Sequence, residues 1–134
     1  MQRLCDLGWQ VSRPLIVPDD LEVIAAWLKE KSAGGECDLL LTSGGTGLAP
    51  RDVTPEATLQ VIQKRVPGLE EAMRAQSLKI TPHAMLSRAV AGVAVRTLIV
   101  NLPGSVRGGL DCLKVIEPAL EHAVALLRGE KPDK

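Results

Sequence analysis

Residues 38–58 read DLLLTSGGTGLAPRDVTPEAT, and this stretch decides the fold class. It opens with a short apolar run, which is typical of a strand buried on both faces of a parallel sheet. Glycines follow at once, and Pro55 directly after Thr54 is typical of the first turn of a helix. The stretch therefore predicts a strand over 38–42, a glycine-rich turn, and a helix capped by Thr54.

The segments on either side repeat this alternation. Residues 10–17 (QVSRPLIV) and 96–101 (RTLIVN) predict two more strands, and Pro14 favours an edge position or a bulge for the first. Between strands, apolar residues recur at helical spacing, as at Leu21, Ile24, Ala25 and Leu28, with Asp19 or Asp20 as the cap. Strands alternating with helices predict an α/β fold: three layers around a mostly parallel open sheet.

Two further features concern the C-terminal helical region. Ser105 is a candidate cap for the helix that follows it, and Pro118 predicts a break before a last helical segment over 119–128. The 134 residues suffice for one domain, which we assign to 1–128, followed by a polar tail over 129–134.

Composition excludes several classes of partner. The formal net charge is zero, which argues against nucleic acid or an anionic membrane as the main partner. Two Trp residues with no Phe or Tyr leave almost no aromatic platform for stacking bases, so the core must be aliphatic. No signal peptide opens the chain and no apolar run reaches the roughly 18 residues of a membrane span, so we expect a cytoplasmic protein.

The three cysteines do not form a metal motif. Cys5, Cys37 and Cys112 are far apart with no CxxC pair, and only two histidines accompany them. We therefore expect free thiols in a reducing compartment.

The glycine-rich turn, Ser43, Gly44, Gly45, Thr46 and Gly47, is a candidate phosphate cradle. Glycines after a buried strand let backbone N–H groups approach an anion without obstruction by side chains. The stretch lacks the Lys of a Walker loop, and Pro50 stands where a dinucleotide fingerprint needs its third Gly. A simple turn is the alternative interpretation.

Four polar clusters are predicted at the carboxyl ends of strands, where ligands gather in open α/β sheets. They are residues 18–20, 43–47, 51–52 and 101–105. Asp19 and Asp52 would suit Mg²⁺, which takes a few carboxylates plus phosphate oxygens. Each residue also has a structural interpretation: Asp19 as a helix cap, Asp52 as a partner of Arg51, and Asn101 as a group that satisfies a strand end.

Several segments together resemble one family. The run 38–58 with its SGGTG and PRDVTPEAT motifs, Pro18-Asp19-Asp20, Met85-Leu86-Ser87-Arg88 and Asn101-Leu102-Pro103-Gly104-Ser105 are similar to the molybdopterin adenylyltransferase family, which includes the G domain of gephyrin. The similarity extends from about residue 8 to residue 128.

This resemblance implies a molybdopterin-binding fold and a role in molybdenum cofactor biosynthesis. The family transfers AMP from MgATP to molybdopterin and releases pyrophosphate. It implies Mg²⁺ and nucleotide roles for Asp19 and Asp52, and a phosphate cradle at Ser43, Gly44, Gly45, Thr46 and Gly47. Ser87 and Asn101 would lie on the pterin side, and Pro103, Gly104 and Ser105 would shape the adjoining loop.

The resemblance also implies a homotrimer and a hand-off of the product to a molybdenum-insertion protein or domain. Two alternatives stay open: a trimerising scaffold module like that of gephyrin, and a domain that binds molybdopterin without adenylylating it. Pyrophosphate release from ATP separates both from the enzyme.

The start of the chain carries a further expectation. Family members begin with a strand, a Ser-Asp motif and a glycine-containing loop, then the helix whose end we predict over residues 2–7. We therefore expect an N-terminally truncated form that is poorly soluble or weakly active alone, and that about 25 to 35 upstream residues, one βα unit, would rescue.

Overall fold

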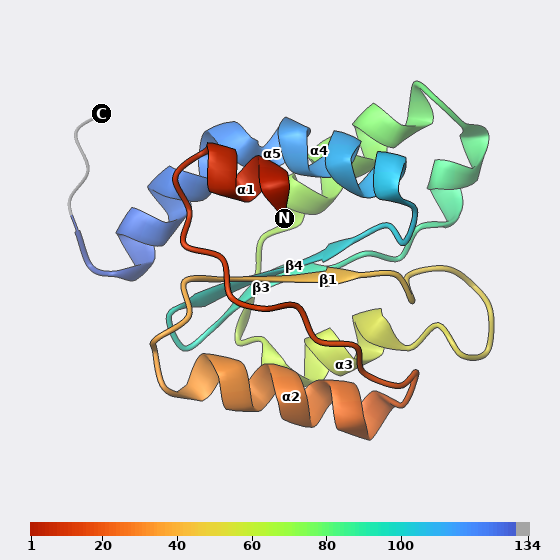
Figure 1. The fold of residues 1–134 in the computed structure, drawn as a ribbon. Coiled ribbons are helices and arrows are strands. Elements are labelled where there is room, and N and C mark those ends of the chain that lie inside the picture. Colours follow the sequence, from red (N-terminus) through yellow and green to blue (C-terminus); the bar gives the residue numbers. More distant parts are fainter. Residues whose placement is uncertain (131–134) are drawn as a thin grey trace.

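The computed structural model describes residues 1–130. A four-stranded sheet with the order β1-β4-β3-β2 forms its middle layer. The strands are β1 (Leu39–Ser43), β2 (Lys64–Arg65), β3 (Ala91–Ala94) and β4 (Thr97–Leu102). Figure 1 shows α2 (Leu21–Ala33) and α3 (Thr54–Val61) on one face of this sheet, with α1 (Gln2–Asp6), α4 (Pro67–Leu78) and α5 (Val106–Leu127) on the other.

The fold class predicted from the sequence is confirmed: three layers around an open sheet. The two longest strands, β1 and β4, run parallel in the register Ser43↔Leu102. The β3–β4 hairpin and the two-residue β2 add antiparallel pairs that the sequence analysis did not predict. Strands this short carry little periodicity, so they left no signal in the sequence.

Strand β4 is the centre of the core, with all six residues buried. Successive side chains of a strand point to opposite faces. Leu98, Val100 and Leu102 therefore join the cluster under α4 and α5, whereas Ile99 joins the cluster under α2 and α3. Both clusters are predominantly aliphatic, as the composition predicts.

Three local predictions are wrong. Residues 10–17 form no strand: in Figure 1 they are an irregular connection from α1 to α2, and Ile16 is wholly exposed. Pro14 has no N–H to donate, and no described strand pairs with this segment. Pro118 lies inside an unbroken α5. Ile116 and Leu120 are buried on either side of it, and their burial offsets the backbone hydrogen bond that proline cannot donate.

The third wrong prediction is the cap of α3. Val53 occupies the cap position and makes no side-chain cap bond, while Thr54 is the first helical residue. Asp20, one of the two candidates, caps α2 through a bond from the Val23 amide (3.1 Å), and Ser105 caps α5 as predicted. Of the predicted tail, residues 131–134 lie outside the described residues.

No helix among residues 1–130 is long and apolar enough to cross a membrane. The short helix α1 is attached to α5 by an ion pair. Arg3 donates to both carboxylate oxygens of Glu117, at 2.6 and 2.8 Å. The hydrogen bond and charge of Arg3 lower the pKa of Glu117 below its ordinary value.

This lowered pKa predicts a pH-dependent contribution to stability. The contribution of Glu117 is full above its unfolded-state pKa of about 4.3 and is lost as the pH falls through the lower folded-state value. The difference in free energy of unfolding between wild type and Glu117→Gln, measured in urea, should therefore be largest at neutral pH and shrink in acid. Glu121→Gln, at an exposed position of the same helix, is the control. A difference that stays constant across this pH range would contradict the prediction.

Candidate functional site

The predicted site residues gather at one edge of the sheet. Because β1 and β4 are parallel, their carboxyl ends meet there, and the loops 44–53 and 103–105 leave from adjacent points. In Figure 1 this is the right-hand edge, where the start of α2 with residues 18–20 and the start of α5 also lie. The clusters at 43–47, 51–52 and 101–105 thus share one edge, as predicted. Residues 18–20 lie at the start of α2 and, against the prediction, follow no strand.

The glycine-rich turn depends on its glycines. Gly44 and Gly45 have φ angles of 91° and 71°, a region that favours glycine. A Cβ on Gly45 would lie 2.3 Å from Thr54 Oγ1, and one on Gly104 would lie 3.2 Å from the Cα of Gly44. Ser43 Oγ donates to the Pro103 carbonyl at 3.3 Å, which joins the two loops. The turn and the 103–105 loop therefore pack backbone against backbone.

The two predicted carboxylates lie on different loops, Asp52 between β1 and α3 and Asp19 ahead of α2. Asp52 is half-buried, and its Oδ2 accepts a hydrogen bond from the Ala49 amide at 3.0 Å. The same oxygen lies 2.9 Å from where a Cβ on Gly47 would be, so Asp52 folds back over the turn. Asp19 is exposed, and the residue that caps α2 is Asp20.

A pocket of about 540 Å³ lies beside these loops. It is bounded by the glycine-rich turn, by α4, by the 3₁₀ helix η1 (Pro82–Leu86) and by the start of α5. Six of the twelve predicted site residues line it: Thr46, Gly47, Ser87, Asn101, Pro103 and Ser105. The others, Asp19, Asp52, Ser43, Gly44, Gly45 and Gly104, lie outside its lining.

Asn101 forms part of the pocket floor but has no exposed surface. Its Nδ2 donates to Thr42 Oγ1 at 2.9 Å and to Thr58 Oγ1 at 3.0 Å, and its Oδ1 accepts from the Val90 amide at 3.0 Å. Both amide hydrogens are thus engaged inside the protein. Asn101 fixes the shape of the pocket, and its amide reaches no ligand without breaking this network.

The sequence analysis missed six of the ten polar side chains that line the pocket: Glu70, Arg74, Ser77, Thr81, His83 and Cys112. Glu70 is buried, accepts from the Ala91 amide at 3.0 Å and pairs with Arg65 at 2.6 Å and Arg74 at 3.6 Å. The i,i+4 spacing of Glu70 and Arg74 was visible in the sequence, but such pairs are common on solvated helices. Only the fold shows that this one borders a pocket.

Cys112 lies 3.4 Å from the Ser77 hydroxyl at the wall of the pocket. Burial raises the pKa of its thiol, and the hydrogen bond with Ser77 opposes that shift only in part. Cys112 therefore forms part of the pocket wall, with a pKa shifted in the direction that disfavours the thiolate. All three cysteines are free, as predicted.

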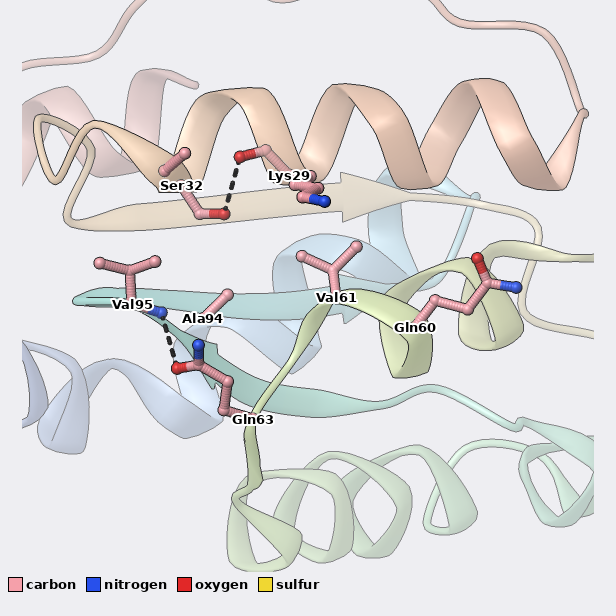
Figure 2. Close-up of a pocket in the computed structure, with 8 residues that line it drawn as sticks. Lys29, Ser32, Gln60, Val61, Gln63, Ala94 and Val95 are labelled. Atoms are coloured by element: carbon pink, nitrogen blue, oxygen red, sulfur yellow. Dashed lines mark hydrogen bonds between the residues drawn. The ribbon is translucent and has the colours of Figure 1, made fainter.

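A smaller cavity of about 180 Å³ lies elsewhere, where α2 and α3 meet the β3–β4 hairpin (Figure 2). Ser32 Oγ donates to the Lys29 carbonyl at 3.3 Å, and the Gln63 side chain accepts from the Val95 amide at 3.1 Å. None of the predicted site residues lines this cavity. The candidate site is therefore the larger pocket with its adjoining loops.

Among residues 1–130, no three His, Cys, Asp or Glu side chains cluster as a metal site. Asp52 offers carboxylate oxygens at this edge, beside the glycine-rich turn. Oxygen donors suit Mg²⁺, which usually keeps several waters or phosphate oxygens in its coordination shell. The donor chemistry of Asp52 therefore suits a cation that arrives with a phosphate ligand.

Comparison with known proteins identifies a family. A model described as a probable molybdopterin-binding domain matches residues 1–122. The chain is 46% identical over 114 residues to a molybdopterin adenylyltransferase of Helicobacter pylori, covering 85% of this chain and 65% of that protein. It is also 46% identical over 119 residues to gephyrin of Dictyostelium discoideum, covering 86% of this chain and 16% of that protein. The chain thus spans less than two thirds of the length of these relatives.

Solved structures agree. The molybdopterin biosynthesis Mog protein of Mycobacterium ulcerans superposes with a TM-score of 0.89 at 39% identity, covering 96% of this chain and 83% of that chain. The molybdopterin biosynthesis enzyme MoaB of Thermus thermophilus reaches 52% identity with a TM-score of 0.78, covering 88% of this chain and 74% of that chain.

The close packing of the turn predicts the effect of adding one methyl group. Gly45→Ala should destabilise the protein by about 1–3 kcal/mol, because the new Cβ meets Thr54 and the φ angle is unfavourable for alanine. Gly68→Ala is the control, since a Cβ there meets nothing within 4 Å. Urea unfolding of both variants measures the difference, and equal stabilities would contradict the assigned turn geometry.

Proposed function

The chain belongs to the family of molybdopterin-binding domains of molybdenum cofactor biosynthesis, and from this premise we propose that it is a molybdopterin adenylyltransferase. The reaction joins a terminal phosphate oxygen of molybdopterin to the α-phosphorus of MgATP. One P–O bond forms there, the bond from the α-phosphorus to the α,β-bridging oxygen breaks, and pyrophosphate leaves. The names of several relatives support this activity.

One observation supports the proposal more than any other. Thr46 and Gly47 line the pocket, and the loop to which they belong also carries Asp52. A flat heterocycle in the 540 Å³ pocket would therefore direct its phosphate toward the loop that faces the nucleotide. Phosphoryl-type transfer depends mainly on positioning and charge neutralisation, which this arrangement supplies.

Roles for individual residues follow from their places. Amides of Gly45 and Gly47 would bind phosphate oxygens, whereas the Gly44 amide already donates to the Leu102 carbonyl at 3.0 Å. Ser87 and Ser105 lie at the pocket with hydroxyls for a polar ring. Pro103 and Gly104 hold the adjoining loop against the turn, and Asn101 supports the floor from within.

Asp19 and Asp52 would hold Mg²⁺ together with the nucleotide. When bound, the cation neutralises negative charge on the phosphates. Asp52 is kept over the turn by the Ala49 amide, so its carboxylate is oriented before the nucleotide arrives. Asp19 is exposed ahead of α2 and does not cap that helix, because Asp20 does.

The wider setting is part of the same proposal. The product would pass to a protein or domain that inserts molybdenum. Free Cys5, Cys37 and Cys112 suit a cytoplasmic location, since that compartment keeps thiols reduced.

Exchanging the loop carboxylate tests the proposed activity. Asp52→Asn keeps an acceptor for the Ala49 amide but loses the charge, so pyrophosphate release should fall by at least about 100-fold with the fold intact. Asp19→Ala should also lower it, without loss of stability because Asp20 is the cap. Asp6→Asn, exposed on α1, is the control.

Near wild-type turnover in Asp52→Asn would overturn the role of this residue. A wild-type protein that binds molybdopterin but releases no pyrophosphate from ATP would instead support the binding or scaffold alternative.

We also propose a homotrimer. Several large apolar side chains are strongly exposed in the single chain, among them Val106 (90%), Met85 (67%) and Leu48 (64%). Exposed apolar groups of this size are a common feature of interaction surfaces. Light scattering at micromolar concentrations should give three times the mass of the chain, and a monomer throughout would contradict the proposal.

A further inference from the structure

Arg88 connects the pocket to the loop that carries Asp52. It follows Ser87, the C-cap residue of η1, and its own amide donates to the Thr46 carbonyl at 2.9 Å. Its guanidinium reaches three more points: Nε donates to the Gly47 carbonyl at 2.8 Å, Nη2 to the Asp52 carbonyl at 2.6 Å, and Nη1 to the Glu56 carboxylate. One residue thus holds the loop at its start, middle and end.

The shape of the guanidinium explains why arginine suits this position. Its N–H donors point in fixed directions in one plane, so three acceptors spread along a loop can be bound at once. A lysine ammonium could replace the charge opposite Glu56. It could not keep the directed bonds to Gly47 and Asp52 together with that ion pair.

The contacts order the loop more than they stabilise the whole protein. The side chains of Arg88 and Glu56 are 34% and 43% exposed, and an ion pair in contact with water contributes little to global stability. The two carbonyl acceptors differ from that pair, because they belong to the backbone whose path places Asp52. Loss of these bonds would free the loop between β1 and α3.

Arg88 is itself held from the pocket side. The carbonyl of Ser87 accepts from Arg74 Nη1 at 2.8 Å, and Arg74 lies 3.6 Å from the buried carboxylate of Glu70. The backbone at 87–88 therefore cannot shift without disturbing α4. This fixes the base from which the Arg88 side chain extends.

We propose that Arg88 is a positioning residue that holds the 44–53 loop, and with it Asp52 and the glycine amides, in the arrangement required for the nucleotide. The inference rests on the proposed adenylyl transfer for its catalytic consequence. The ordering of the loop itself can be measured without any activity.

The test uses four variants of the full chain. Arg88→Met removes all side-chain donors, Arg88→Lys keeps the charge, and Glu56→Gln weakens only the ion pair. Arg128→Met is the matched control, because Arg128 makes a similar ion pair with Asp38. In that pair Nε donates to Oδ1 at 3.1 Å. Asp38 lies at the opposite end of β1 from the loop.

The first readout is hydrogen exchange at the amides of Ala49, Asp52 and Thr54, which bond within the loop. In Arg88→Met, the hydrogens of these amides should exchange about tenfold faster than in wild type, whereas the free energy of unfolding in urea should change little. The exchange rates in Arg88→Lys and Glu56→Gln should fall between those of Arg88→Met and wild type. Arg128→Met should match wild type at these amides.

The second readout is the kinetics of pyrophosphate release. Arg88→Met should lower kcat/KM for MgATP by about 100-fold, as expected when reacting groups lose their alignment. The KM for molybdopterin should change far less, because α4 and α5 still form the other walls of the pocket. Arg88→Lys should recover part of the loss.

Each outcome decides a separate question. Unchanged exchange in Arg88→Met overturns the inference whether or not the protein is active. Faster exchange with wild-type kinetics overturns the positioning role and leaves a structural contact. If the wild-type protein releases no pyrophosphate, the proposed function fails, and so does the role of Arg88 in that reaction. Hydrogen exchange still decides, in that case, whether Arg88 orders the loop. If Arg88→Met does not fold, Arg88→Lys and Glu56→Gln carry both readouts.

Discussion

The fully buried amide of Asn101 joins parts of the protein that are distant in sequence. It lies in β4 and binds Thr42 in β1, Thr58 in α3 and the amide of Val90 ahead of β3. Thr58 in turn donates to the Thr54 carbonyl at 2.8 Å, which extends the network to the residue that packs on Gly45. A buried amide must find partners or lose several kcal/mol of solvation, at roughly 1–3 kcal/mol for each unpaired group. The central strand, its parallel neighbour and the start of α3 are therefore tied to one geometry.

This constraint explains why the site forms where it does. Parallel pairing brings the ends of β1 and β4 together, so the glycine-rich turn and the 103–105 loop must cross closely. Gly44 and Gly104 permit that approach, and the pocket opens beside them between α4 and α5. Arg88 binds the loop carrying Asp52 through the carbonyls of Thr46, Gly47 and Asp52. The site thus combines a floor fixed by the Asn101 network with a loop bonded to Arg88.

The sequence predicted the parts of the fold that are encoded locally. The apolar run at 38–42 and its counterpart at 96–101 correspond to β1 and β4, and the helical spacing from Leu21 corresponds to α2. Its errors have a common source. The 10–17 segment has the composition of a strand, yet a strand exists only when another backbone pairs with it. Pro118 would break an isolated helix, but α5 is held along the sheet by the residues on either side of it.

The sequence by itself determined the family, the α/β class, the glycine turn and the edge at which Asp52 and the 101–105 segment lie. These features follow from residue types at short spacing, which govern backbone conformation directly. Only the tertiary structure decided that Asn101 is internally engaged, that Glu70 and Arg74 border the pocket, and that Arg88 holds Gly47 and Asp52. The partners of Arg88 are 41 and 36 residues away in sequence. No local pattern encodes such pairs, because their distance is set by how the layers pack and by which buried polar groups must satisfy one another.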